Sequence, residues 1–476
     1  MKVTQVALCP TEASTAAGRP ALTPELLAAS GARYSRNNEG LESILAKIDP
    51  NNLDKSVDSI FRMIDYGHQS IADMAPVAMF IDGISMWLAY HVWTLCPTAG
   101  GQESSTRYIK LSPESLIAPT QLGIAENAQA EWHRLMQECF AAYSHALEYW
   151  EAIAAQHPEV ARIPRSLLDD PSEKAARQVA RMQRNYGFDR ARNFLPVAVA
   201  TNMMLIMSAR AWVQLCQHLL SHPLSEAKTL GEALRHELEL CAPRMLKHAT
   251  AKDSMQNGIE ADLEALRQTA RRGTFTYLQE NASPYECPPT PQLQVMLPAG
   301  IKEEALAHDL IFHDNRYAWI GESLKRTAVR FGWEAVAFAE IRDLNRHRTG
   351  TKHCPFIPVG FYSALDQVPQ DLMNSMTTHL PDYLATLSLT GKRISVTAHE
   401  HLIEGDYSYV YWTLLGTQYA FEHVTTADKF IYEAELRTGT GAHFRYAKHL
   451  HDALSLWYEK FPATRGLILE GSAEPE

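Results

Sequence analysis

A proline-rich break divides the chain into two halves that share one order of structural patterns. Within residues 276–291, prolines recur too closely for any helix to continue. In the first half, residues 77–81 read as a short strand and residues 84–95 as the apolar helix after it. In the second half, residues 327–331 read as the strand and residues 333–345 as the helix. Two copies of one α+β unit explain this shared order.

The two predicted repeats are long enough to form separate domains. We place the first repeat at residues 1–275, the linker at 276–291 and the second repeat at 292–476. Apolar residues at helical spacing from Trp132 to Trp150 predict a long amphipathic helix with a buried stripe. Similar patterns predict further helices over about residues 170–188, 203–220 and 226–242.

The chain has an ordinary globular composition with an acidic charge balance. Of its 476 residues, 46% are hydrophobic and 21% are charged, and the formal net charge is −11. A duplex-binding protein needs a basic face to neutralise phosphates, and the sequence contains no basic stripe. We therefore expect no nucleic-acid partner. A small anionic ligand is still allowed, because a few arginines in one pocket suffice to bind it.

Neither a membrane segment nor a disulfide framework is indicated. No apolar run approaches the roughly 20 residues that a membrane-spanning helix needs. The first six residues, 1–6, do not resemble a secretion signal. The seven cysteines are widely spaced and contain no Cys-x-x-Cys pair, which also argues against a zinc knuckle. We expect a reduced, cytoplasmic protein with no membrane partner.

The segment 100–108 groups residue types that suit a sugar phosphate. Two glycines allow the backbone to approach a ligand closely. Glu103, Ser105 and Arg107 then offer an acceptor, a hydroxyl and a guanidinium that can bind phosphate oxygens in a fork. The alternative is a polar loop in which Glu103 and Arg107 pair with each other.

A basic tripeptide, Arg346-His347-Arg348, follows the predicted helix of the second repeat. Three basic groups in a row can form an anion clamp. The alternative is structural, because cations at the C-terminal end of a helix are favoured by its dipole.

Two further clusters have equally plain structural explanations. Residues 189–196 contain two arginines and end on a proline, as expected for a helix end with exposed cations. Glu433 and Arg437 are four residues apart on the predicted penultimate helix, where they could form a surface ion pair.

Taken together, these clusters resemble the flavin-dependent thymidylate synthases. That family carries Arg-His-Arg, then a Glu-x-Ser-x-Arg-Tyr stretch, with a Gly-His-x-Ser-like element upstream and Ala-Arg-x-x-Leu-Pro downstream. The first repeat has three of these elements in the family's order, at residues 67–70, 103–108 and 191–196, within about residues 60–245. A second, more diverged pass covers about residues 310–455 and includes the basic tripeptide.

Each repeat has lost what the other keeps. Residues 95–97, Leu-Cys-Pro, stand where the first repeat should carry Arg-His-Arg, and residues 349–359 have lost Glu-x-Ser-x-Arg-Tyr. Family members are homotetramers with sites between subunits. The resemblance therefore implies an α+β fold of two tandem repeats, each a small antiparallel sheet with long helices. It also implies an internal pseudo-dimer with one divided site, and a homodimer of the chain as a pseudo-tetramer.

The resemblance implies a role for each matched residue. The residues implied to bind the nucleotide substrate are Glu103, Ser105, Arg107, Arg192, Arg346 and Arg437, of which Arg346 and Arg437 are catalytic. The residues implied to contact FAD are Ser70, Glu103, Arg210, Ser323, Arg346, His347 and Arg348. The reaction implied is methylation of dUMP at C5, with NADPH and methylenetetrahydrofolate as co-substrates.

Three other interpretations use the same residues. The chain could modify a different pyrimidine nucleotide or a related substrate on the same scaffold. It could also bind nucleotide or flavin without catalysis, as a decayed duplicate. A metal site at His347, His353 and Cys354 has suitable ligand types, but the arginines beside His347 would repel a cation, so we expect no metal.

Overall fold

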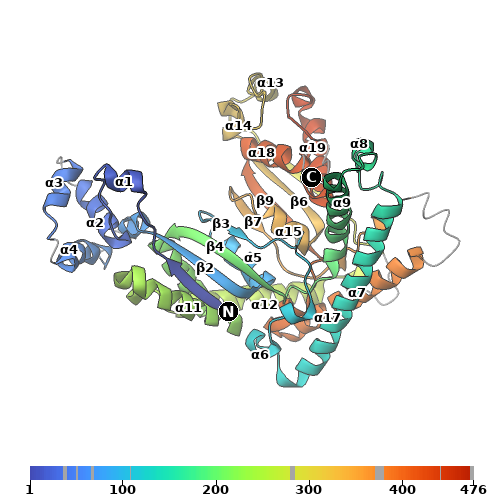
Figure 1. Ribbon diagram of the computed structural model, residues 1–476, viewed down its shortest axis with the longest axis horizontal. Helices are drawn as coiled ribbons and strands as arrows, with labels where there is room; N and C mark the ends of the chain where they lie inside the picture. The colour runs from blue at the N-terminus through green and yellow to red at the C-terminus, as the bar shows by residue number, and fades with distance from the viewer. Residues whose placement is uncertain are drawn as a thin grey trace. The chain divides into compact units, whose positions relative to one another are not determined.

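The computed structural model describes residues 1–35, 40–49, 52–65, 69–107, 109–278, 285–369, 380–439 and 441–471. In this part of the chain, helices accompany two antiparallel sheets (Figure 1), so the predicted mixture of helix and antiparallel sheet is confirmed. The chain forms two compact units. Unit 1 comprises Met1–Ser104, Ile117–Glu126 and Val199–Ala265, and unit 2 comprises Ser105–Leu116, Asn127–Ala198 and Leu266–Glu476.

Unit 1 contains the first sheet and the helices around it. Its strands are β1 (Lys2–Val6), β2 (Pro76–Ser85), β3 (Gly100–Glu103) and β4 (Ala200–Ser208). Its helices are α1 (Glu12–Ala16), α2 (Pro24–Tyr34), α3 (Leu41–Ala46), α4 (Leu53–Asp65), the 3-10 helix η1 (Gln69–Met74), α5 (Met86–Leu95), α6 (Pro119–Leu122), α10 (Ala209–Ser221) and α11 (Ser225–Cys241). Helix α12 (Asp253–Arg272) continues from unit 1 into unit 2.

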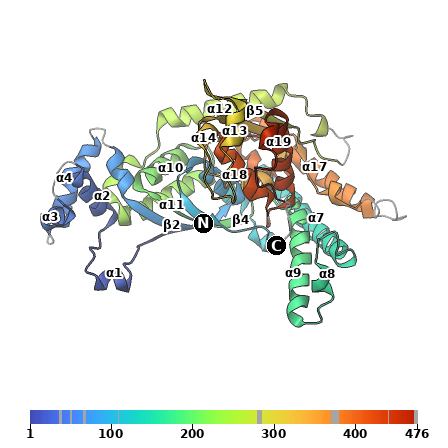
Figure 2. The same cartoon turned by 90° about the horizontal axis from the view of Figure 1, so that it is seen from above.

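The first sheet has the strand order β1-β2-β4-β3, with every pair antiparallel. Its central pair shifts register between Asp82 and Ile84, where Gly83 takes a φ of +72° that favours glycine. Helices α10 and α11 lie side by side next to this sheet (Figure 2). Ser85 caps α5 by accepting from Leu88 N, and its own hydroxyl donates to buried Glu226 on α11.

Unit 2 contains the second sheet and the longest helices. Its strands are β5 (Pro291–Met296), β6 (Ala328–Ala337), β7 (Thr351–His353), β8 (Gly360–Phe361) and β9 (Thr417–Thr426). Its helices are α7 (Gln129–Gln156), α8 (Arg165–Leu168), α9 (Glu173–Ala191), the 3-10 helix η4 (Arg192–Phe194), α13 (Glu303–His308), α14 (Glu322–Arg326), α15 (Phe338–Leu344), α17 (Leu380–Glu404), α18 (Ala427–Thr438) and α19 (Phe444–Lys460).

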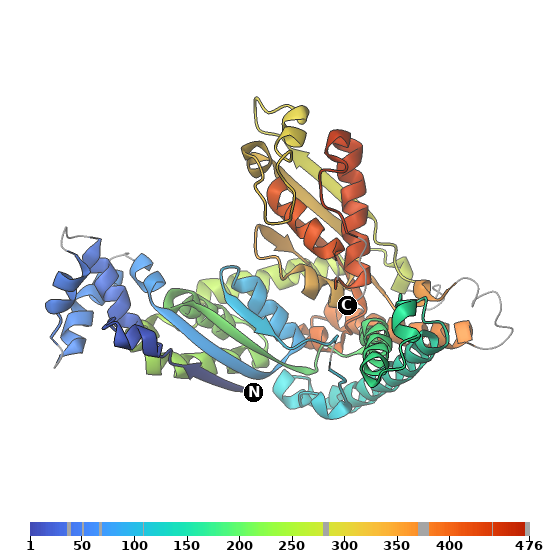
Figure 3. The ribbon, with the colours of Figure 1, turned by 45° about the horizontal axis from the view of Figure 1, so that its top comes forward.

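The second sheet repeats the topology of the first. Its order is β5-β6-β9-β7, with β8 pairing β9 beside that path. In both sheets the first strand pairs the second, the second pairs the last, and the last pairs the third. The central pair β6–β9 also shifts register, between Trp333 and Val336, as β2–β4 does. Helices α18 and α19 lie side by side next to this sheet (Figure 3). This shared order supports a second, diverged repeat.

Several predicted helix limits were wrong. The helix predicted over 84–95 begins at Met86, and the helix predicted over 333–345 begins at Phe338 because β6 runs to Ala337. The predicted helix over 203–220 begins with strand β4 and turns helical only at Ala209. On β4, apolar residues occupy both faces, so the alternation that marks a strand is hidden in the sequence. The helices predicted from Trp132 to Trp150 and over 170–188 and 226–242 are confirmed as α7, α9 and α11.

The compact units divide the chain differently from the predicted repeats. Residues 127–198 of the first predicted repeat belong to unit 2. There, Trp132 on α7 donates to the carbonyl of Tyr411 at 3.0 Å, and Gly416 N donates to the carbonyl of Asn193 at 2.7 Å. The predicted limits 1–275, 276–291 and 292–476 concern the sequence repeats and stay a prediction. Part of the predicted linker, residues 279–284, lies outside the described residues.

The search for membrane-crossing helices was negative: no helix among the described residues has both the length and the apolar character required.

Candidate functional site

Unit 2 brings residues of both predicted repeats together where α9 and α15 end. Arg192, at the start of η4, donates from Nη2 to Oδ2 of Asp343 on α15 at 3.0 Å. Both side chains are buried. The other carboxylate oxygen of Asp343 lies 3.7 Å from Nε of Arg346, whose side chain is half exposed. Burial alone would raise the pKa of Asp343, but the surrounding cations, Arg192 first, hold it below its usual range.

Arg107 is held by a carboxylate of its own unit. Its Nε and Nη2 donate to the two oxygens of Asp189 at 2.7 and 2.9 Å, a two-pronged pair. Its Nη1 donates to the carbonyl of Gly441 at 3.1 Å. Ser105 accepts from Arg107 N at 3.2 Å, which orders the turn between them. The alternative pairing of Glu103 with Arg107 is therefore wrong, because the fork of Arg107 is engaged by Asp189.

His347 and Arg437 form the second contact of the site. Nε of Arg437 donates to Nε2 of His347 at 2.7 Å, so this ring nitrogen is an acceptor and the imidazole is neutral. The pKa of His347 is lowered to about 4, chiefly by burial; the Glu433 carboxylate opposes this shift, and the Arg437 cation adds to it. The ammonium of Lys352 donates to the carbonyl of His347 and holds the backbone of the tripeptide.

Glu433 contacts His423 and not Arg437. Its Oε2 lies 3.0 Å from Nδ1 of His423, and both side chains are fully buried. Burial would raise the pKa of Glu433, but His347, His423 and Lys352 lower it to about 2. The surface ion pair between Glu433 and Arg437 considered from their spacing is therefore wrong.

His443 joins the start of α19 to the end of α9. Its Nδ1 accepts from Arg445 N at 3.2 Å and caps α19, so Nε2 carries the proton and donates to the carbonyl of Asp189 at 3.1 Å. Burial lowers the pKa of His443 to about 3, so the ring is neutral near pH 7. Asp189, Asp343 and His443 organise the site. The sequence reasoning assigned them no role, although Asp189 stands inside the arginine cluster 189–196.

Three predicted flavin residues belong to unit 1. Ser70 lies exposed in η1, and Glu103 accepts from Trp93 Nε1 at 3.1 Å. Arg210 donates to Asp73 at 2.9 Å in a partly exposed ion pair. The predicted elements Gly67-His68 and Tyr108 lie outside the described residues.

The remaining predicted residues belong to unit 2. Ser323 is half-buried in α14, where its carbonyl accepts from the hydroxyl of Thr327 at 2.8 Å. Arg348 is half-buried directly after His347. Among the described residues, no group of three His, Cys, Asp or Glu side chains is placed to hold a metal ion.

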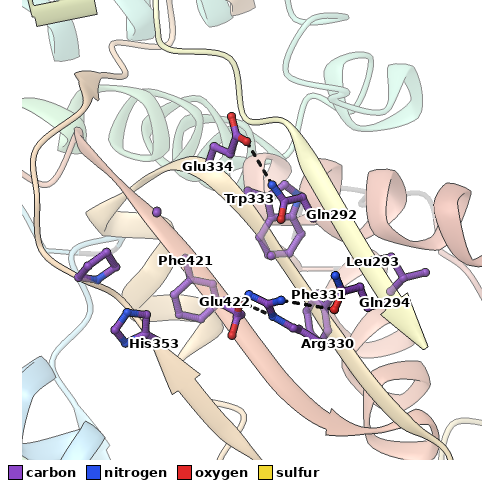
Figure 4. Close-up of a pocket in the computed structure, with 13 residues that line it drawn as sticks. Gln292, Leu293, Gln294, Arg330, Phe331, Trp333, Glu334, His353, Phe421 and Glu422 are labelled. Carbon is purple, nitrogen blue, oxygen red and sulfur yellow. Dashed lines mark hydrogen bonds and ion pairs between the residues drawn. The ribbon is translucent and has the colours of Figure 1, made fainter. Parts of the chain in front are cut away.

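In the part of unit 2 that the structure describes, two hollows can be compared. One, of about 150 Å³, lies on the second sheet, where Arg330 contacts Glu422 and Gln294, and Gln292 donates to Glu334 (Figure 4). The other, of about 410 Å³, lies between α9 and α19 and touches the site through Arg107 and Asp189. Only the second hollow adjoins the charged residues described above.

A family model described as thymidylate synthase complementing protein matches residues 21–244. This region of the chain is similar to that family. The predicted resemblance is thereby confirmed, and the matched region contains Ser105, Arg107 and Arg192. The basic tripeptide and Arg437 lie beyond the region that matches the thymidylate synthase complementing family. The shared sheet topology and the contact of Arg192 with Asp343 link the tripeptide to the matched region.

Among solved structures, the chain is similar to a crystal structure of a UMP/dUMP methylase, PolB from Streptomyces cacaoi, bound with 5-Br dUMP. The identity is 15% and the TM-score is 0.30, over 52% of this chain and 93% of that chain. A comparison with curated proteins gave no match.

Proposed function

We propose that this protein catalyses flavin-dependent methylation at C5 of a uridine nucleotide, with dUMP as the favoured substrate. FAD would be the cofactor, and NADPH and methylenetetrahydrofolate the co-substrates. The similarity of residues 21–244 to the family supports thymidylate synthase-like chemistry. The observation that carries the proposal is the contact of Arg192, from that region, with Asp343, which precedes Arg346 and His347. Arg192 of the first predicted repeat and the tripeptide 346–348 of the second thus lie in one compact unit.

Arg437 is the residue to which we assign stabilisation of charge on the pyrimidine. Its Nε is fixed by a neutral histidine, which orders the guanidinium without neutralising it. Within the described part of the chain, no carboxylate lies at ion-pair distance from Arg437. A preorganised, uncompensated cation of this kind stabilises an anion that develops in the transition state.

Four residues of unit 2 complete the proposed substrate site: Ser105, Arg107, Arg192 and Arg346. Arg192 and Arg346 share Asp343, so this carboxylate sets the spacing of two cations. The guanidinium of Arg107 already donates to Asp189, so any contact with a substrate would be shared with that carboxylate. Its clearest contribution is therefore to hold the turn that carries the Ser105 hydroxyl.

The residues present suit an anionic cofactor. Arg346 is half exposed and lies 3.7 Å from its carboxylate partner, which leaves it able to bind a diphosphate oxygen. Within unit 2, we assign Arg346, His347, Arg348 and Ser323 to FAD. When bound, the flavin would supply the reducing electrons for the one-carbon transfer.

The first test is spectroscopic. The purified protein, incubated with FAD and desalted, should retain about one flavin per chain and show flavin oxidation that depends on dUMP. Tritium release from C5 should then be compared for dUMP, UMP and dCMP. If only UMP or only dCMP releases tritium, that nucleotide, and not dUMP, is the substrate. If flavin is retained but no nucleotide releases tritium, the protein binds flavin without catalysing the reaction. If the protein retains no flavin, the redox mechanism is overturned.

Assembly of the chain is part of the same proposal. We propose a homodimer, by analogy with the tetramers of the family. Its solution mass should be about twice the 53.4 kDa of one chain. A single-chain mass by light scattering would contradict it.

A further inference from the structure

The larger hollow of unit 2 has the size of a small-molecule site. Its volume of about 410 Å³ lies within the range of about 300–1,000 Å³ that ligand pockets usually have. Helix α9 contributes Tyr186, Asp189 and Arg190, and α19 contributes Phe444 and Lys448. Arg107 also lines it, so the hollow is continuous with the proposed site.

Arg190 is the exceptional residue of this hollow. Only 7% of it is exposed, and its guanidinium carbon lies 3.4 Å from the ring centre of Tyr186 and 4.3 Å from that of Phe444. Nη1 donates to the carbonyl of Tyr186 at 3.2 Å, whereas Nε has no hydrogen-bond partner. Across the described residues, no carboxylate lies at ion-pair distance from it.

Other buried arginines of unit 2 have carboxylate partners. Arg192 donates to Asp343, and Arg445, which is 1% exposed, lies among three carboxylates. A buried charge is costly unless it is paired, and burial accordingly lowers the pKa of Arg190. The missing counterion of Arg190 is therefore expected from outside the protein.

The geometry around Arg190 selects the kind of anion. The rings of Tyr186 and Phe444 lie against the guanidinium, and Arg190 lines the hollow, so an anion held there would meet this arginine from the hollow. An in-plane approach by two oxygens is how arginine binds phosphate. Arg162 and Lys448 line the same hollow and add positive charge at the rim.

We propose that Arg190 binds the phosphate of a phosphate monoester in this hollow, with Arg162 and Lys448 as secondary contacts. The identification of that ester as the uridine nucleotide substrate rests on the proposed function. The phosphate would then lie beside Arg107, and Arg190 would distinguish nucleotide from nucleoside.

Equilibrium binding without flavin tests this directly. Calorimetry on the full chain should compare inorganic phosphate, uridine, UMP and dUMP. We expect the nucleotides to bind at least about tenfold more tightly than uridine, the scale of one charge-assisted contact. Arg190→Gln should abolish that preference and weaken phosphate binding by about tenfold. Arg190→Lys, which keeps the charge but loses the planar edge, should recover only part of both.

The matched control is Arg177→Gln on the same helix, because Arg177 is exposed and forms an i,i+4 ion pair with Glu173. It should bind phosphate as the wild type does. Thermal melting should show that Arg190→Gln is folded, since the change leaves no carboxylate unpaired. If that variant does not fold, Lys448→Gln should still weaken phosphate binding by a few-fold.

The outcomes separate this inference from the proposed function. Wild-type protein that ignores millimolar phosphate, or an Arg190→Gln variant that binds UMP like the wild type, overturns the inference. Methylation of uridine as readily as dUMP also overturns it, while the proposed function stands. Phosphate binding that depends on Arg190, without tritium release from any nucleotide, supports the inference and removes the proposed function.

Discussion

Helices α5 and α15 occupy the same place in their sheets, yet their surroundings differ in chemistry. Each follows the second strand of its sheet. On α5, His91 stacks on Trp87 at 5.0 Å, and the rings of His218 and His222 each lie 5.2 Å from it. Burial lowers the pKa of His91 well below its usual range, so this cluster is uncharged near pH 7.

On α15, the same place is filled by charges. Asp343 contacts Arg192 and Arg346, and one turn earlier Glu340 contacts His449 at 2.6 Å. Burying charges is costly and is sustained where partners or ligands compensate them. The two sheets share a strand order, yet the helix after the second strand packs against rings in unit 1 and carries buried charges in unit 2. A shared topology therefore does not impose the same chemistry at this position.

The largest expected effect is on catalysis by the charged residues of unit 2. Arg437→Ala should lower turnover of the nucleotide by about 100-fold to 1,000-fold, because it removes a preorganised cation. Flavin content should stay near that of the wild type, and Arg177→Gln is the control. Full turnover by Arg437→Ala, measured by tritium release, would show that the ionic cluster is structural.

The next effect is on stability. Asp343→Asn should lower the free energy of unfolding by about 3 kcal/mol, because it leaves buried Arg192 without its carboxylate. Asp73→Asn, which breaks the partly exposed pair with Arg210 in unit 1, should cost less than about 1 kcal/mol. Urea denaturation measures both changes. Equal losses would mean that the contrast between the repeats does not extend to energetics.

The uncharged histidines predict a pH dependence. His222 and His443 have folded-state pKa values of about 3, below the usual 6.5, so the unfolded state binds more protons between these values. Stability should therefore fall as pH drops from about 6.5 towards 3, by at most about 1.4 kcal/mol per pH unit for each such histidine. His91→Phe should make this loss shallower. If the slope of unfolding free energy against pH does not change, His91 is not a buried, uncharged side chain.

The smallest effect concerns the hollow on the second sheet. Arg330→Gln removes a partly exposed pair with Glu422 and should leave the urea midpoint of unfolding close to that of the wild type. It should leave phosphate binding unchanged, in contrast to Arg190→Gln. A tenfold loss of phosphate affinity in Arg330→Gln would move the anion site to that sheet.

Much of the architecture could be predicted because its signals are local. The helical spacing from Trp132 to Trp150 marks α7, and the proline that follows Arg192 marks the end of α9 and η4. Strand β4 was missed because Met204 and Ile206, on its outer face, are as apolar as the buried residues between them. The second repeat was visible because the order of strand and helix survives even where motif residues have changed.

The sequence by itself determined the helix periodicity, and it predicted two repeats and the residue types of a divided motif. Only the tertiary structure decided which charges meet. Arg107 binds Asp189, 82 residues away, and Arg192 binds Asp343, 151 residues away. Among the described residues, no carboxylate lies at ion-pair distance from Arg190, and Tyr186 and Phe444 pack against it instead. Spacing along a chain reveals neighbours on one helix, whereas partners on different elements depend on how those elements pack.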